Sequence, residues 1–322
     1  MSMRLFWPWV GAAAIVACAA PESPVRVARP ERHATVPASP PPPAHPPDPS
    51  IPPPPKTARE PRSCGALGCR VFDTVEQAFA FVLESNPRVL AVGETHAPRG
   101  TEGIDSAVAR FTRLLLPLVA DRAKALVVEL PISDGHCGSD EQKLAKIREE
   151  VSREQSEKNP NEYVQLATTA RDLGIVPYPL RLTCDQFATI AKAGSDDIPT
   201  ALTIVAKAME RQVKQCLQRA PAGLVLTYGG ALHNDLTPEP QRASWSFGPA
   251  LRQATDGAYV ELDLIVREFI KDNEAWRTLE WTHYFDPQAH PHEAVIYEPT
   301  PKSYVLIFPA STPQADLSAI GR

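Results

Sequence analysis

Short apolar runs alternate with longer amphipathic stretches from about residue 71 onward. The runs predict buried strands at 89–92, 125–130, 175–180 and 224–227. Apolar residues at three- and four-residue spacing predict helices at 71–86, 104–118, 138–173 with a break at 159–160, and 197–217. Short strands separated by helices are typical of βαβ units. We therefore expect an α/β domain whose central sheet is mostly parallel and flanked by helices.

The C-terminal part of the chain changes this pattern. A further strand is expected at 259–266, and the runs 294–297 and 304–308, joined by a proline-rich turn, predict a hairpin near the edge of the sheet. Pro177 and Pro179 place the strand at 175–180 at an edge as well, because proline has no N–H to donate to a neighbouring strand. The sequence predicts one globular domain, 62–322, with an antiparallel C-terminal edge.

Polar residues follow two of the buried strands. Glu94 and His96 come after the strand that stops at Gly93, and their i, i+2 spacing sends both side chains to the same side. In open α/β sheets ligands bind beyond the carboxyl ends of the strands. The strand at 224–227 likewise meets glycines at 229 and 230 and is followed by His233. The alternative is a polar loop with one incidental histidine.

Glu129 lies inside an otherwise apolar strand. A buried carboxylate is costly unless it is paired or functional. It would share the edge of the sheet with Glu94 and His96 if the two strands are parallel neighbours. The alternative is a structural ion pair with Arg110 or Arg113.

Three segments, G-E-T-H at 93–96, V-V-E-L at 127–130 and G-G-A-L-H-N at 229–234, resemble the signature segments of the Tiki superfamily. That group includes erythromycin-esterase-like hydrolases, TraB-type proteins, Tiki metalloproteases and ChaN-like haem-binding lipoproteins. The resemblance spans roughly 87–265. It implies an α/β fold with a site built from the four residues Glu94, His96, Glu129 and His233.

Two carboxylates and two imidazoles support two hydrolytic chemistries on an ester or amide of a small molecule or peptide. In one, His96 takes a proton from water, a carboxylate orients it, and His233 stabilises or protonates the reacting oxygen. In the other, His96, His233 and Glu94 hold a divalent metal that activates water. No G-x-S-x-G segment is present, which disfavours a serine triad.

The ChaN-like branch suggests an alternative without catalysis, the binding of haem or another iron compound. Tyr228 or Tyr284, or a site histidine, could ligate the iron. An apolar pocket would favour haem, whereas a narrow polar cleft would favour hydrolysis. A scaffold with a vestigial site is a third hypothesis. The nearby His283, His290 and His292 fit a surface loop better than a metal site, because no third ligand is fixed.

The N-terminus has the features of an export signal. Residues 1–17 followed by Cys18 match a bacterial lipoprotein signal peptide, whereas an ordinary secretory signal with a chance cysteine is the alternative. Residues 18–61 are rich in proline and predict a disordered, polyproline II tether without a core. With Ala19 after the cysteine, we expect a lipid anchor in the cell envelope, at the outer membrane.

Five cysteines remain after Cys18. Cys64 and Cys69 predict a local loop closure, and Cys137 and Cys184 would be neighbours if the strands before them are adjacent. Cys216 is expected as a buried thiol. A zinc site lacks any C-x-x-C spacing. The formal net charge of −5 argues against nucleic acid as a partner.

Overall fold

The computed structural model describes residues 60–132, 136–195 and 197–311. The predicted signal peptide, Cys18 and the tether up to residue 59 lie outside the described residues. Among the residues that are described, no helix is long and apolar enough to cross a bilayer.

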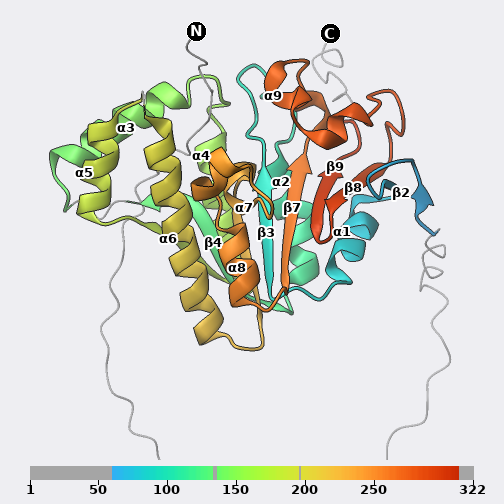
Figure 1. Cartoon of the computed structure of the whole chain (residues 1–322), viewed down its shortest axis with the longest axis horizontal. Coiled ribbons are helices and arrows are strands. Elements are labelled where there is room, and N and C mark those ends of the chain that lie inside the picture. The colour runs from blue at the N-terminus through green and yellow to red at the C-terminus, as the bar shows by residue number, and fades with distance from the viewer. Residues whose placement is uncertain (1–59, 133–135, 196, 312–322) are drawn as a thin grey trace, which may run out of the picture. The chain divides into compact units, whose positions relative to one another are not determined.

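A single sheet runs through the described domain in the order β1-β2-β8-β9-β7-β3-β6-β4-β5 (Figure 1). Its strands are β1 Arg62–Ser63, β2 Arg70–Phe72, β3 Val89–Glu94, β4 Ala123–Ile132, β5 Val176–Arg181, β6 Leu224–Gly230, β7 Tyr259–Ile265, β8 Ala294–Thr300 and β9 Ser303–Ile307. The strands from β9 to β5 are parallel, whereas β8, β2 and β1 pair antiparallel at the other side. The predicted fold class is confirmed.

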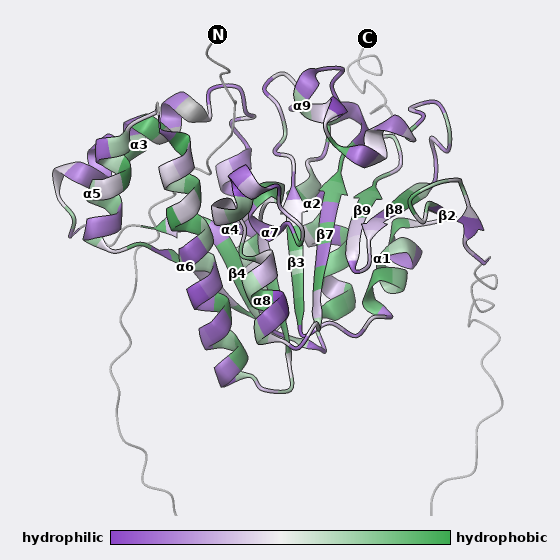
Figure 2. Ribbon diagram, viewed as in Figure 1, coloured by the Kyte–Doolittle hydropathy of each residue, from purple (hydrophilic) through white to green (hydrophobic). Residues whose placement is uncertain are grey.

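Helices cover both faces of the sheet, because alternate strand residues point to opposite sides. On one face, Leu90 and Val92 of β3 pack with α1, α2 and α4. On the other, Val89 and Ala91 pack with α5, α6 and α8. The α-helices are α1 Val75–Leu83, α2 Ala107–Arg110, α3 Ser139–Val151, α4 Asn159–Asp172, α5 Cys184–Ala193, α6 Ile198–Arg219, α7 Ala231–Asn234, α8 Gly248–Ala254 and α9 Glu274–Arg277. Figure 2 shows the apolar interior of the sheet, interrupted by hydrophilic positions on β7.

Strand order differs from the expectation in two places. β6 lies between β3 and β4, so the first βαβ unit does not pair its own two strands. The C-terminal hairpin of β8 and β9 is present, but β2 and β1 extend the sheet beyond it. Local periodicity specifies which residues are buried in a strand and carries no information about the neighbouring strand. β5 does lie at the opposite edge, as its prolines predicted.

Three predicted helices have different bounds. Residues 71–72 belong to β2, and α1 begins only after Thr74, whose side chain accepts from Gln77 N. The stretch 104–118 contains α2, then a π-helical turn at Phe111–Leu115 and a 3₁₀ turn at Leu116–Val119, because Pro117 prevents a regular α-helix. The stretch 138–173 divides into α3 and α4, but α3 ends at Val151 and α4 begins at Asn159, where the break was expected. Helix α5 was not predicted.

Two disulfides join the predicted cysteine pairs. Cys64 bonds to Cys69, and Cys137 bonds to Cys184 across the loops that follow β4 and β5. These strands are adjacent in the sheet, which was the condition for the second pair. Cys216 is a buried free thiol on α6.

Candidate functional site

Glu94 ends β3 and His96 follows it beyond the carboxyl edge of the sheet. Both are almost fully buried, and His96 Nδ1 lies 2.7 Å from Glu94 Oε1. The extended backbone therefore sends both side chains to one side, as their spacing predicted. Since the carboxylate accepts the Nδ1 proton, the neutral imidazole carries its lone pair on Nε2. That Nε2 is buried without a hydrogen-bond partner.

Two buried tyrosines also donate hydrogen bonds to the Glu94 carboxylate. Tyr163 on α4 donates to Oε1 at 2.9 Å, and Tyr228 on β6 donates to Oε2 at 2.7 Å. Tyr228 pairs in register with Val92, so it lies on the same face of the sheet as Glu94. With these donors and His96, both oxygens of Glu94 are satisfied, which favours a fixed carboxylate.

The second histidine, His233, lies on the short helix α7 directly after β6. Its Nδ1 lies 2.7 Å from the carbonyl oxygen of Trp245, and its Nε2 lies 3.3 Å from Glu129 Oε1. The other oxygen of Glu129 accepts the backbone N–H of Gly230 at 2.7 Å. Glu129 therefore pairs with His233. The alternative partners are engaged elsewhere, Arg110 with Glu268 and Arg113 with Asp105.

Gly229, near the end of β6, and Gly93, near the end of β3, both approach their neighbours closely. A Cβ on Gly229 would overlap Glu129 Oε2, and a Cβ on Gly93 would lie 2.7 Å from Ala231 Cα and 2.5 Å from Asp263 Oδ1. Real Cβ atoms do not make such contacts, so glycine is required at both positions for the strand ends to meet.

Three polar residues of β7 support α7 from behind. Tyr259 OH donates to Asn234 O at 2.5 Å, Glu261 Oε2 accepts from Leu236 N at 2.8 Å, and Asp263 Oδ1 accepts from Asn234 Nδ2 at 3.0 Å. Their i, i+2, i+4 spacing places all three on one face of the strand. This set fixes the backbone on which His233 stands.

Burial and neighbouring charges shift the pKa values of three residues at the site. Burial lowers the pKa of His96, but the hydrogen bond and charge of Glu94 outweigh it, so the pKa is raised. Burial is similarly outweighed by Glu129 at His233, whose pKa is also raised. Burial raises the pKa of Glu129, yet the opposite charge of His233 brings it below the usual value. The pKa shifts of Glu129 and His233 have opposite directions, because each residue stabilises the charged form of the other.

The carboxyls behind α7 titrate differently. Burial and the neighbouring Asp263 raise the pKa of Glu261 well above its usual value. Burial raises the pKa of Asp263 to about 7, against a hydrogen bond from Asn234 that lowers it. These two groups therefore retain protons that exposed carboxyls would lose.

The donor set for a metal is incomplete in this arrangement. Among the described residues, no group of three or more His, Cys, Asp and Glu side chains is placed to hold an ion. Glu94 is bonded to His96 and two tyrosines, and His233 faces Glu129. Glu94, His96 and His233 thus do not form a common ligand set, and the metal-assisted alternative stays a prediction.

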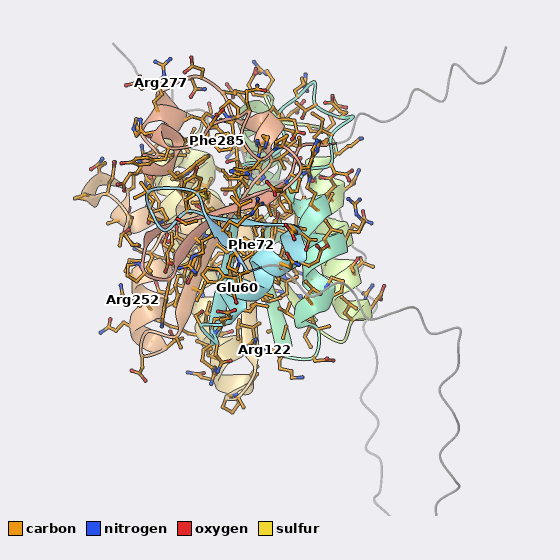
Figure 3. The ribbon with its side chains drawn as sticks, turned by 90° about the vertical axis from the view of Figure 1, so that its right-hand side faces the viewer. Glu60, Phe72, Arg122, Arg252, Arg277 and Phe285 are labelled. Carbon is orange, nitrogen blue, oxygen red and sulfur yellow. A yellow bond between two sulfur atoms is a disulfide. The ribbon has the colours of Figure 1, made fainter. Side chains whose placement is uncertain are left out.

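The two tyrosines considered for iron lie in different surroundings. Tyr228 is fully buried and bonded to Glu94, whereas Tyr284 is 51% exposed in the C-terminal segment. Figure 3 places Arg277 and Phe285 of that segment at the end of the molecule opposite Arg122, the residue just before β4. His283 is exposed there, and His290 pairs with Glu293.

The segment between α3 and α4 packs against the chain just after His96. Ser156 N donates to Ala97 O at 2.8 Å, Arg99 N donates to Glu154 O at 2.9 Å, and Pro98 forms a β-bridge with Gln155. A cleft of about 690 Å³ is lined by three residues of α3, by Arg99, by Pro160 and by 152–153 and 155–157. Of the described lining residues, all except Pro160 are polar or charged.

Sequence reasoning missed Tyr163, Asn234, Glu261 and Asp263. Tyr163 carried no signal, because a tyrosine at an apolar helix position is usual in a core. Glu261 and Asp263 did carry one, since they lie in a strand with apolar neighbours, as Glu129 does.

Comparisons with known proteins identify no family. No protein-family model matches the chain, and no curated protein matches it in sequence. A solved structure of the erythromycin esterase EreC, a variant in its open conformation, is similar to this chain with a TM-score of 0.45 and 9% identity. The match covers 75% of this chain and 95% of that one.

Proposed function

We propose that the protein is a hydrolase of ester or amide bonds, with His96 as general base. The observation that carries the proposal is the buried imidazole of His96, whose Nδ1 is fixed by Glu94 while its Nε2 lacks a hydrogen-bond partner. Unpaired buried nitrogens are costly, and they are retained where they act on a ligand. Glu94 pairs in register with Gly230, the residue before α7, so His96 and His233 both follow the carboxyl ends of neighbouring strands.

The geometry suggests a role for each group. His96 Nε2 removes a proton from water, whose oxygen forms a bond to the substrate carbonyl carbon. Glu94, held by its two tyrosines, keeps the His96 tautomer and offsets the positive charge that develops. The Nε2–H of a protonated His233, which faces Glu129 in the free protein, turns to the carbonyl oxygen and then gives its proton to the leaving group as the bond from the carbonyl carbon to that group breaks. Glu129 keeps His233 protonated.

Replacing His96 tests this assignment. His96→Ala removes the base and is expected to lower kcat/KM about 10²- to 10⁴-fold on any ester or peptide that the protein cleaves. His283→Ala, an exposed histidine outside the site, is the matched control and should keep full activity. Full activity in folded His96→Ala protein would refute the catalytic role.

Haem binding, the alternative from the sequence, receives less support. Tyr228 donates its hydroxyl to Glu94, and the described residues that line the cleft at Arg99 are mostly polar or charged. A haemin titration separates the two functions, because a stoichiometric Soret shift that Tyr228→Phe abolishes would favour iron binding.

The cellular setting remains a further proposal. Cleavage before Cys18 would leave a lipid-modified N-terminus, with the proline-rich tether holding the domain away from the membrane. Metabolic labelling with palmitate tests it, and Cys18→Ser should remove the label. Membership of the Tiki superfamily is also a proposal, and it rests on the resemblance of the segments 93–96, 127–130 and 229–234.

A further inference from the structure

An unpaired buried amide lies in the segment that packs against the chain just after the proposed catalytic base. Gln155 lines the cleft and is 6% exposed, yet its Nε2 has no hydrogen-bond partner. Asn159 explains why this end of the amide is free, because Asn159 Nδ2 donates to Gln155 Oε1 at 3.2 Å. The orientation of the Gln155 amide is thereby set, with its oxygen engaged and its N–H₂ unused.

The same small region connects this amide to His96. Asn159 Nδ2 also donates to Ala97 O at 3.2 Å, and Pro98 pairs with Gln155. One turn further along α4, Tyr163 holds Glu94. Asn159 and Tyr163 are i, i+4 neighbours, so one face of α4 contacts both the cleft wall and the catalytic carboxylate. His96 Nε2, Gln155 Nε2 and Asn159 Oδ1 are each buried without a hydrogen-bond partner.

The remaining lining limits what the cleft can take. The positive and negative side chains among its described lining residues balance. They are the bases Arg99, Lys146 and Arg153 and the acids Glu149, Glu150 and Glu157. Among the described residues that line the cleft, Pro160 alone is apolar, which leaves a hydrocarbon chain little to pack against there. A free N–H₂ requires an oxygen acceptor from the ligand.

We infer that the cleft is the substrate-binding subsite of the hydrolase, and that Gln155 selects a polar, uncharged chain by donating to an oxygen such as an amide carbonyl. Gln155 is thus a specificity-determining residue, and Asn159 is a positioning residue that acts through it. The cleavage step rests on the proposed function, but binding in the cleft does not.

Binding is tested on the full chain with N-acetylglycinamide as the probe. The side-chain amide resonances of Gln155 are assigned by their loss in Gln155→Glu, which keeps the acceptor for Asn159. We expect these resonances to shift saturably with the probe. Hexan-1-ol, which has no carbonyl oxygen, should move them far less. Gln155→Glu and Gln155→Leu should each weaken binding about fivefold, as expected for one lost hydrogen bond. Thr168→Ala, on the exposed side of α4, is the control.

Hydrolysis is measured separately, with N-acetylglycine 4-nitrophenyl ester and 4-nitrophenyl hexanoate. Gln155→Glu should raise KM for the first ester about fivefold and leave kcat and the second ester unchanged. Gln155 resonances that the probe leaves unmoved would overturn the inference, even if both esters are cleaved. A shift without cleavage of either ester would support the subsite and count against the hydrolase.

Discussion

Asn234 Nδ2 donates to Asp263 Oδ1 at 3.0 Å and to Ala91 O at 3.2 Å, and so joins the residue next to His233 to two strands. Asp263→Ala removes one of these acceptors, and the α7 turn should lose its fixed position. We expect kcat to fall about tenfold or more with little change in KM. The reason is that a displaced His233 would no longer be positioned to donate to the reacting oxygen.

The conservative variant separates position from charge. Asp263→Asn retains an oxygen for Asn234 and should keep kcat within about threefold of the native value. Tyr297→Phe, which removes a hydrogen bond to Tyr284 O in the C-terminal segment, controls for lost stability. Equal losses of activity in all three variants would show that Asp263 contributes stability alone.

The pKa of Asp263 also predicts how stability depends on pH. Its carboxyl has a pKa of about 7 in the fold, against 3.8 as the usual value, so the folded chain holds more protons between these limits. Stability from this group therefore falls as pH rises from about 4 to 7. Asp263→Asn does not titrate, and its urea midpoint should decline less over this range. Parallel curves for the two proteins would contradict the assignment.

Activity should show a bell-shaped pH dependence. His96 must be neutral to accept a proton, and its raised pKa places the acid limb of kcat/KM above 6.5. His233 must be protonated, and its raised pKa places the basic limb above 6.5 as well. Glu129→Gln removes the charge that sustains His233 and should move the basic limb to lower pH. A basic limb that stays in place in this variant would exclude His233 as the acid.

Gly229 and Gly103 form a matched pair of glycines, neither of which has a positive φ. A Cβ at Gly229 would overlap the buried Glu129 carboxylate, whereas one at Gly103, in an exposed turn, would meet no atom within 4 Å. Gly229→Ala should cost about 2 kcal/mol or more and abolish activity. Gly103→Ala should change stability by less than about 0.5 kcal/mol. Denaturant midpoints compare the two, and similar costs would refute the close approach.

The two disulfides should differ in their effect on stability. Cys137 and Cys184 are 47 residues apart, and Cys64 and Cys69 only 5. Loop-closure entropy predicts a loss of about 4 kcal/mol when the first pair is replaced by serine and about 2 kcal/mol for the second. Urea titrations of the two double variants measure the difference. An equal loss would indicate that the reduced chain keeps α3 and α5 together by other contacts.

Much of the site could be predicted because strand ends are visible in the sequence. Glu94, His96, Glu129 and His233 each follow or interrupt an apolar run, and the parallel sheet brings such positions to one edge. The insertion of β6 could not be predicted, since β3 and β4 have the same apolar pattern whichever strand lies between them. Tyr163 was hidden for a similar reason, because its role depends on where α4 packs. Gln155 lies in a stretch whose sequence predicts a charged, solvated helix. In the fold it pairs with Pro98 instead and is buried.

The place of β6 between β3 and β4 has a consequence for the order of folding. Tyr228 and Glu94, which touch in the finished site, are separated by 134 residues of chain. During synthesis β3 and β4 appear first but must leave room for a strand that follows the whole of α3 to α6. Contacts of such long range form slowly. A nascent chain therefore has no assembled site until β6 is in place, and cleavage activity can begin only when nearly the entire domain has been made.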